Sequence, residues 1–374
     1  MPLSLGTARA APGKIKYGAW DFVAHPSGGR DRLPVIIAQG DPRGPVLWVT
    51  ASIHGPEHTG ILVVHQLINR ELVRKLHGTI VALPTLNPAG VRTLKRQPYY
   101  HDGDPNRAFP DGRPPHKPDP DDEPPSSTEQ AYARLLKEIK ASADCMVDLH
   151  NWSGSLSYVF KDTVFYRSDR SAAQNKAARA GARRMDARLA EMCAAYGHTT
   201  INELPARKYL AEKLHRSTTS AAVNVARLPA LTMELGDGNF PDSAMVRAAT
   251  AGLRNLMRWA GMLADPPEPI TGIRIIDPGY PCRRMETPRV STACIVRHLV
   301  EAGEIVERGQ PLAEIRDIWG RPTGEKILRS EHDGWIMARS AGVAFYPGAA
   351  VCTMAVHSSL DTVQPYPKDF FKRG

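Results

Sequence analysis

Apolar positions along the first two thirds of the chain occur in two alternating arrangements. Continuous apolar runs of strand length occur at 45–53, 78–86, 145–149 and 229–235. Segments with helical spacing separate them, at 59–76, 126–142, 169–196 and 242–263. An apolar run without alternation is typical of a strand buried on both faces. Strands that alternate with helices predict an α/β domain around a mainly parallel, mixed sheet flanked by helices. Ser126 and Glu129 have the spacing of a capping box at the start of one predicted helix.

The pattern changes after residue 265. The proline-rich segment 265–269 resembles a linker, and short β-type runs separated by glycine turns follow it. We therefore predict an α/β domain over residues 1–265 and a smaller all-β, barrel-like domain over 266–374. Residues 1–44 are expected to be partly irregular or to form edge strands. The segment 111–125 is rich in Pro and Asp, so we expect a surface loop there.

The composition is that of a soluble globular protein. The chain of 374 residues is 42% hydrophobic and 23% charged, which are ordinary values. No apolar run approaches the ~20 residues of a membrane helix, and the first residues lack the apolar stretch of a signal peptide. The five cysteines are widely spaced and include no CxxC pair. That spacing favours reduced thiols in a cytoplasmic protein over a disulfide framework or a cysteine zinc site.

The formal net charge of +9 raises the question of nucleic-acid binding. The basic residues are dispersed, and no basic run interleaves with aromatic residues, so we predict no nucleic-acid partner. The positive charge would favour anionic small substrates or simply aid solubility. The composition does not separate these two interpretations.

Polar residues follow each of the four predicted strands. The first strand runs into His54 and Glu57, and the second runs into Asn87. The third ends at His150 and the fourth at Glu234. Ligands bind beyond the carboxyl ends of the strands in an open α/β sheet. The sequence therefore predicts that two histidines and two glutamates meet at one edge of the sheet.

This group of side chains fits a catalytic zinc site. Such sites take three protein ligands, often two His and one Glu, and keep one position open for water. His54 and Glu57 are close enough in sequence to chelate one ion, and His150 could be the third ligand. Glu234 would then act as general base. His58 could also pair with His54, but no HExxH pattern supports that choice.

Arg96 and Arg107 lie in loops between the second and third predicted strands. The planar guanidinium group binds carboxylates through two parallel hydrogen bonds. Near a metal ion, one arginine would suit a developing oxyanion and the other a substrate carboxylate. Without the metal motif, both would be interpreted as solvated loop charges.

Five motifs occur in the order known from one enzyme family: HGPEHTG (54–60), NPAG (87–90), DPNRAFP (104–110), VDLHN (147–151) and MELGDG (233–238). On these residues the chain resembles the aspartoacylase and succinylglutamate desuccinylase family, within the zinc carboxypeptidase superfamily. The resemblance spans roughly residues 45–260. It implies a zinc carboxypeptidase-like fold and one Zn²⁺ ion per chain.

The resemblance also implies roles for individual residues. The implied zinc ligands are His54, Glu57 and His150. The implied catalytic residues are Glu234, as the catalytic carboxylate, and Arg96, which would polarise the scissile carbonyl. The expected substrate-binding residues are Asn106, Arg107 and Asn151, of which Arg107 with Asn106 would hold a substrate carboxylate.

Two features depart from the family pattern. Pro105 stands where the family usually has Leu, which could alter the approach to the next two residues, and the insert after Pro110 is longer than expected. Family members often place a tyrosine from the later part of the chain near the substrate. The candidates are Tyr166, Tyr209, Tyr280 and Tyr346.

The C-terminal region resembles the β-domain of bacterial family members and, through residues 303–315 and 333–336, biotinyl and lipoyl carrier barrels. A carrier would present a modifiable lysine at a hairpin tip. Lys326 is the only lysine between Gly303 and Gln364, and it lacks the flanking pattern of an acceptor. We interpret this domain as a cap over the active site or as an oligomer contact.

The sequence thus predicts a zinc-dependent amide hydrolase that removes an acyl group from a small N-acyl amino acid or related amine. The alternatives are a metallocarboxypeptidase acting on peptides and a non-catalytic binding or carrier protein. The acyl group, the amine and the choice between a linear and a cyclic amide stay open. The expected partner is a small-molecule substrate, with no membrane partner and a homodimer as the default assembly.

Overall fold

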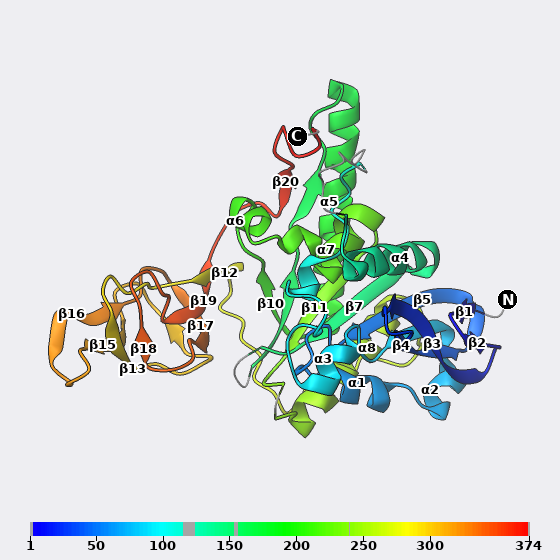
Figure 1. Cartoon of the computed structure of the whole chain (residues 1–374), viewed down its shortest axis with the longest axis horizontal. Coiled ribbons are helices and arrows are strands. Elements are labelled where there is room, and N and C mark those ends of the chain that lie inside the picture. Colours follow the sequence, from blue (N-terminus) through cyan, green and yellow to red (C-terminus); the bar gives the residue numbers. More distant parts are fainter. Residues whose placement is uncertain (1–2, 115–123, 153–155, 239, 373–374) are drawn as a thin grey trace.

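A sheet of 12 strands runs through the computed structural model, which describes residues 3–114, 124–152, 156–238 and 240–372 (Figure 1). Its centre consists of four parallel strands in the order β6 (His77–Leu83), β5 (Asp41–Ala51), β7 (Cys145–His150) and β11 (Ala230–Leu235). They contain the four apolar runs of the sequence, and β7 is buried at every position. Helices on both faces account for this burial.

The strand direction reverses on both sides of this centre. β8 (Ser157–Lys161) pairs antiparallel with β11, and β10 (Thr199–Asn202) pairs parallel with β8. On the other side, β4 (Arg30–Gln39) pairs antiparallel with β6, and β3 (Lys14–Ala24) forms the edge of the sheet. The predicted α/β fold is confirmed. Its sheet is mixed, and parallel pairing is concentrated at the centre.

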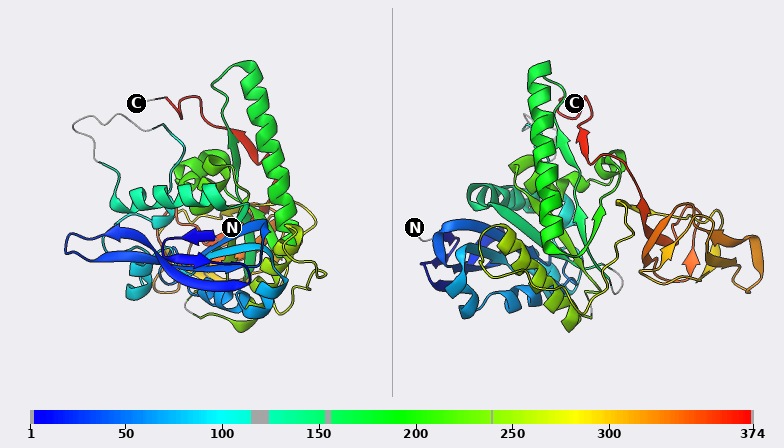
Figure 2. Two further views of the ribbon diagram at one scale, coloured as in Figure 1. Left: turned by 90° about the vertical axis from the view of Figure 1, so that its right-hand side faces the viewer. Right: turned by 180° about the vertical axis from the view of Figure 1, so that it is seen from behind.

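Helices pack in two groups on opposite faces of the sheet (Figures 1 and 2). The first group contains α1 (Thr59–Leu67), α5 (Ala172–Tyr196) and α8 (Ser243–Trp259), and α8 contacts both of the others. The second group contains α4 (Ser127–Ser142) and α7 (Thr218–Ala221), together with the π-helical turn at 222–226. The predicted capping box at the start of α4 is present.

The segment 59–76 forms two helices, α1 and α2 (Arg70–Lys75), where the sequence predicts one. Ile68 has an extended backbone and ends α1. The Asn69 side chain then accepts a hydrogen bond of 2.9 Å from Leu72 N and starts α2. Asparagine favours this position because its side-chain oxygen satisfies a backbone N–H that has no partner within the helix.

Shorter elements complete the α/β domain. The small hairpin at the N-terminus is formed by β1 (Leu3–Leu5) and β2 (Ala8–Ala10). The short helical elements are α3 (Pro88–Thr93), η1 (Pro105–Arg107), α6 (Ala206–Ala211) and η2 (Leu214–Arg216). Most of the predicted loop 111–125 lies outside the described residues. Among the described helices, none has the length and apolar character needed to cross a membrane.

The C-terminal β-domain extends the large sheet and adds a second one. β12 (Cys282–Glu286) pairs with β10 and is followed outwards by β19 (Cys352–His357), β17 (Gly334–Arg339) and β14 (Ile305–Val306). The second sheet has the order β16 (Pro322–Arg329), β15 (Pro311–Arg316), β13 (Cys294–His298) and β18 (Ala344–Phe345). Apolar side chains of both sheets, such as Val296 and Met354, share one core. The domain projects from one side of the α/β domain (Figure 1).

The end of the chain returns to the α/β domain. β20 (Val363–Pro365) pairs in parallel with β9 (Val164–Tyr166). The rings of Tyr366 and Phe165 stack with their centroids 4.8 Å apart, and Phe370 stacks on Tyr366. The β-domain is therefore attached to the α/β domain at two places, through β12 and through this tail.

Arg283 of β12 connects these two attachments. Arg283 is buried, with only 2% of the residue exposed. It donates hydrogen bonds to the carbonyl oxygens of Glu203, at 2.6 Å, and Leu360, at 3.0 Å. Because Glu203 follows β10 and Leu360 precedes β20, one buried guanidinium links the sheet to the tail.

Arg283→Met should therefore lower the free energy of unfolding by about 2–4 kcal/mol, because buried carbonyl groups lose a charged donor. Urea denaturation followed by circular dichroism would measure the change. Arg308→Met, at an exposed position of the same domain, is the control and should stay within ~0.5 kcal/mol of the unmodified protein. Equal stability of the two variants would contradict the role of Arg283.

Candidate metal centre and active site

The candidate site is built on one face of the sheet, where the strand register aligns polar side chains. His150 of β7 is the Cα partner of Glu234 in β11, and Asp148 is the partner of Thr232. Across β11, Phe160 of β8 is in turn the partner of Thr232. Partner residues point to the same face of a sheet, as do residues two apart along a strand. The register therefore places these side chains on a common surface.

The loop after β5 brings His54 and Glu57 to the end of this surface. The Asn87 side chain supports the loop by donating to the carbonyl oxygen of Ile53 at 3.0 Å. Gly55 passes so close to α3 that a Cβ atom there would lie 2.2 Å from the carbonyl of Gly90. The NPAG motif thus has a positioning role, because it fixes the backbone that carries the two polar side chains.

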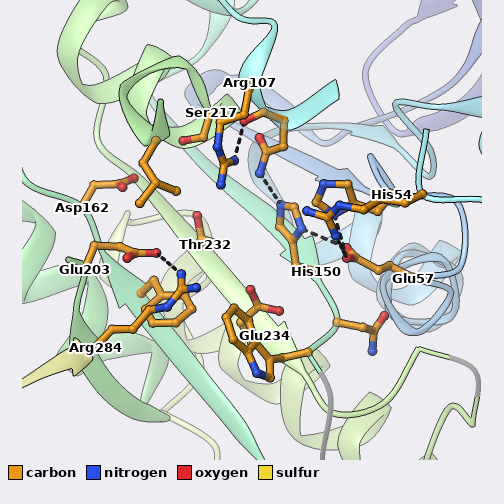
Figure 3. A pocket seen from close by; sticks show the side chains of 16 residues that line it. His54, Glu57, Arg107, His150, Asp162, Glu203, Ser217, Thr232, Glu234 and Arg284 are labelled. Carbon is orange, nitrogen blue, oxygen red and sulfur yellow. Dashed lines mark hydrogen bonds and ion pairs between the residues drawn. The ribbon is translucent and has the colours of Figure 1, made fainter. Parts of the chain in front are cut away.

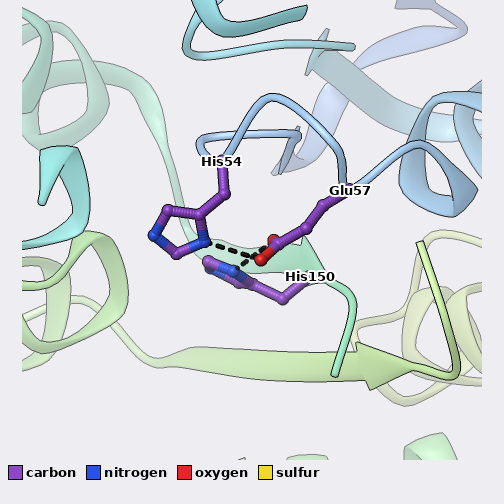
Figure 4. A group of neighbouring side chains, drawn as sticks. All are labelled: His54, Glu57 and His150. Carbon is purple, nitrogen blue, oxygen red and sulfur yellow. Dashed lines mark hydrogen bonds and ion pairs between the residues drawn. The ribbon is translucent and has the colours of Figure 1, made fainter. Parts of the chain in front are cut away.

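The predicted metal ligands lie together. His54 Nδ1 is 2.7 Å from one oxygen of Glu57, and His150 Nδ1 is 2.9 Å from the other (Figure 4). The three residues each offer a ligand atom within 4.8 Å of the others, and all three are buried. The structure therefore assembles the two-His, one-Glu set that the sequence predicts.

Two further carboxylates orient the histidine rings. Asp148 lies 2.9 Å from His150 Nε2, and Asp104 lies 3.0 Å from His54 Nε2. Thr50 donates to the other oxygen of Asp148 at 2.6 Å. Metal-binding histidines usually hydrogen-bond a carboxylate through the ring nitrogen that does not bind the ion. Both rings have this arrangement, with Nδ1 directed at the centre of the cluster.

The electrostatics of the cluster suit a cation. Burial alone would raise the pKa of Glu57, but the two histidine rings lower that pKa to about 2. Burial alone would lower the pKa of His150, but Asp148 and Glu57 hold it well above its usual range. The cluster thus favours positive charge between ionised carboxylates. Metal binding displaces protons from such ligands, and two nitrogens with one carboxylate are a suitable donor set for Zn²⁺.

Glu234 lies beside the cluster without belonging to it. Its Oε2 atom is buried and has no hydrogen-bond partner among the described residues. Burial raises the pKa of Glu234 to about 8, while the neighbouring His150 opposes this rise. A buried carboxylate with a free oxygen and a raised pKa is suited to accepting and returning a proton near neutral pH.

Arg96 and Asn106 are also at the cavity. Arg96 Nη2 donates to Asp104 at 2.8 Å, and its Nη1 lies 3.8 Å from Glu57 Oε1. Asn106 Oδ1 accepts hydrogen bonds from the backbone and the hydroxyl of Thr218 at 2.9 and 3.0 Å. These contacts fix the Asn106 side chain with its amide nitrogen on the side of His150, 3.5 Å from Nε2.

Arg107 has donors left over for a ligand. Its Nε donates to the carbonyl oxygen of Glu212 and its Nη1 to that of Asn106, both at 2.8 Å. No ion pair of Arg107 is found in the described part of the chain. The backbone contacts hold the guanidinium in place at the cavity (Figure 3). Burial lowers the pKa of Arg107, while the charges of Asp104 and Glu203 oppose this change.

Asn151 lines the cavity, but its side-chain amide forms several hydrogen bonds within the protein. Its Nδ2 donates to Thr59 Oγ1 at 2.8 Å and to the carbonyl oxygens of Leu235 and Gly236 at 2.7 and 3.1 Å. Its Oδ1 accepts from Thr59 N at 3.3 Å. These bonds join the loop after β7 to α1 and to the end of β11. Its predicted substrate-binding role stays a prediction.

All eight predicted residues line one cavity of about 320 Å³, which continues across the face of the sheet (Figure 3). The far end of this cavity was not found by sequence reasoning. Its charged residues are Asp162, Glu203 and Arg284. Asp162 follows β8 and Glu203 follows β10, two strands that the sequence analysis does not identify. The short runs SYVF and TTI, which are rich in aromatic and β-branched residues, could have predicted these two strands.

The candidate tyrosines do not line this cavity. Tyr209 lies behind its wall and donates a hydrogen bond of 2.6 Å to Asp162. Tyr346 is 78% exposed on the β-domain. Tyr166 and Tyr280 are likewise not among the lining residues. Of the four candidates, Tyr209 is the one with a hydrogen bond to a residue of the cavity wall in the described part of the chain.

Comparison with known proteins identifies the family of the chain. Residues 43–260 match the family model of the succinylglutamate desuccinylase/aspartoacylase catalytic domain. No curated protein matches the chain. Among solved structures, the product-bound ectoine utilization protein of Ruegeria pomeroyi is similar, with a TM-score of 0.68 and 18% identity over 95% of this chain and 98% of that one.

A succinylglutamate desuccinylase from Silicibacter sp. TM1040 has a TM-score of 0.67 and 18% identity, over 96% of this chain and 98% of that one. At such identities the solved structures show a shared fold. The family model spans more than half of the sequence. The chain therefore belongs to the succinylglutamate desuccinylase/aspartoacylase family.

Proposed function

We propose that this protein is a zinc-dependent deacylase that hydrolyses the amide bond of a small N-acyl amino acid or related N-acylated amine. One observation carries the proposal. The cluster of His54, Glu57 and His150 shares a cavity with the unpartnered carboxylate oxygen of Glu234. Membership in a family named for deacylases of amino acids supports the same reaction class.

Glu234 would move the proton in this reaction. Zinc at the three ligands would supply a Lewis acid that lowers the pKa of water towards ~7. Glu234 would take a proton from the attacking water through its free Oε2 atom. It would then pass that proton to the departing amine as the C–N bond breaks, which yields a carboxylic acid and a free amine. A raised pKa makes both transfers feasible near neutral pH.

Arg96 would stabilise the developing oxyanion. Its guanidinium lies beside the cluster, 3.8 Å from Glu57 and 2.8 Å from Asp104. Loss of one such donor typically costs ~3 kcal/mol of transition-state stabilisation. Arg107 would bind a carboxylate of the substrate, because two backbone carbonyls hold its guanidinium at the cavity.

The rival functions have less support. A cavity of about 320 Å³ suits a small molecule better than a peptide chain. A carrier role would need an exposed lysine at a hairpin tip, but Lys326 lies within strand β16. Hydrolysis of peptides in a substrate panel would instead favour the metallocarboxypeptidase hypothesis.

Further features of the proposal are a single zinc ion per chain, a cytoplasmic location and a homodimer. The five cysteines are all buried and free, as expected for a reducing compartment. We also retain the proposal that the two sheets of the β-domain form a barrel-like unit, since they enclose one core. The division of the chain at residue 265 is likewise a proposal.

The first test is release of free amine from a panel of N-acyl amino acids and N-acyl diamines by the zinc-loaded protein. We expect hydrolysis of at least one member, and complete loss of turnover in Glu234→Gln with zinc still bound. Zinc content by atomic absorption and folding by circular dichroism are the controls. Absence of stoichiometric zinc from the unmodified protein would refute the metal site, and an active Glu234→Gln would refute the proton-transfer role.

Arg107→Lys should raise KM by about tenfold or more while leaving kcat nearly unchanged, because an ammonium cannot replace the guanidinium fork. Steady-state kinetics on the best panel substrate would show this. Arg92→Lys is a matched control, since Arg92 pairs with Asp31 at a site outside the cavity. A fall in kcat alone for Arg107→Lys would contradict substrate binding through this residue.

Asp104→Asn should weaken zinc binding by about ten- to a hundredfold, because carboxylates that orient metal-binding histidines typically have effects of that size. Competition with a chromogenic chelator would measure the affinity. Asp102→Asn is the control, because Asp102 is exposed and only two positions away. If both variants bound zinc as tightly as the unmodified protein, Asp104 would have no orienting role.

A further inference from the structure

A second cavity, separate from the candidate active site, lies against the side of helix α5. Its volume is about 460 Å³, and it shares none of its described lining residues with the first cavity. One wall is a face of α5, the long green helix in Figure 2. The segment after β9 and the turn before β11 form the other walls. These segments bring three arginines to the cavity, at Arg167, Arg170 and Arg227.

The three arginines carry more positive charge than the surrounding protein neutralises. None of the described residues that line the cavity is acidic. Asp169 stands next to it and pairs with Arg167, whose Nη2 and Nε lie 2.6 and 3.0 Å from the carboxylate oxygens. Hydrogen bonds from Arg167 lower the pKa of Asp169, and the charge of Arg170 adds to this effect. In the described part of the chain, Arg170 and Arg227 have no ion pair of their own. One carboxylate beside three guanidinium groups leaves an excess of two positive charges.

Contacts within the protein position these two arginines. Arg227 is partly buried, and its Nη1 donates to the carbonyl oxygen of Phe165 at 3.0 Å. Burial lowers the pKa of Arg227, while Tyr366 opposes this change. The Asn175 side chain fixes the backbone of Arg170, because it accepts from the N–H at 3.1 Å and donates to the carbonyl at 2.8 Å. A partly buried cation without a carboxylate partner is unfavourable unless a ligand supplies the opposite charge.

The helix wall of this cavity is apolar. Ala178, Ala182 and Met185 lie on one face of α5, at intervals of four and three residues. The two alanines leave room beside the helix, and the flexible thioether of Met185 can adapt to an aromatic ring. A ligand could therefore place its charged group at the arginines and an apolar or aromatic group against this wall.

A phosphate monoester matches two guanidinium groups better than a single carboxylate does. It has a charge of about −1.5 to −2 at neutral pH and three acceptor oxygens, which arginine binds through paired hydrogen bonds. We propose that this cavity binds a small organic phosphate. The phosphate group would lie at Arg170 and Arg227, with an apolar or aromatic group against Ala178, Ala182 and Met185. Binding at this site would not require the deacylase function.

Isothermal titration calorimetry of the full-length, zinc-loaded protein with AMP tests this site. We expect one AMP to bind per chain, and its two parts, inorganic phosphate and adenosine, to bind about tenfold or more weakly. Arg170→Gln should weaken AMP binding by about tenfold, the size expected for a hydrogen bond to a charged group. The Arg170 side chain makes no hydrogen bond in the described part of the chain, so this variant should fold normally. The double variant Arg170→Gln/Arg227→Gln should lose about a hundredfold.

The double variant Arg74→Gln/Arg308→Gln is the matched control. It changes the net charge equally at two exposed positions outside the cavity and should keep the AMP affinity. Arg107→Gln should also keep it, because Arg107 lines the other cavity. Absence of AMP binding, or unchanged affinity in Arg170→Gln/Arg227→Gln, would overturn the proposed site. Inorganic phosphate binding as tightly as AMP, or loss of AMP binding in Arg107→Gln, would overturn it as well.

Discussion

The register of the strands β7, β11, β8, β10 and β12 is the constraint on which the site depends. Side chains alternate between the faces of a strand, so a shift of one residue would move every functional group to the other face. The observed register brings His150 beside Glu234 and Thr232 beside Phe160. The cavity therefore follows a line of partner residues across the sheet, and its two ends are fixed relative to each other by backbone hydrogen bonds.

Charge compensation then explains why polar residues are tolerated along this line. Each histidine of the cluster lies between Glu57 and an outer carboxylate, Asp148 or Asp104. Buried carboxylates are stable when hydrogen bonds or opposite charges satisfy them. Glu234 and Asp162 are the exceptions, since each has a buried oxygen without a partner among the described residues. Unsatisfied groups of this kind concentrate at functional sites.

The metal end of the cavity could be predicted from the sequence, whereas the far end could not. His54 follows β5, and His150 and Glu234 lie at the ends of β7 and β11. These parallel strands are continuous apolar runs, so strand position and chemistry could be deduced together. Asp162 follows β8, which runs antiparallel to its neighbour β11. The rule that parallel strands end at the same edge of a sheet therefore does not place Asp162. Arg284 comes from another domain, and only the pairing of β12 with β10 brings it close. The break at Asn69 was missed because a local side-chain cap competed with helical periodicity.

The β-domain gains a functional meaning from this arrangement. It projects away from the α/β domain, yet β12 continues the catalytic sheet and carries both Arg283 and Arg284. Adjacent residues of a strand point to opposite faces, so one arginine can bind the sheet to the C-terminal tail while the other faces the cavity. A displacement of the β-domain would thus change the far wall without moving His54, Glu57 or His150. The residues of the His54, Glu57 and His150 cluster and those of the far wall are accordingly anchored in different parts of the fold.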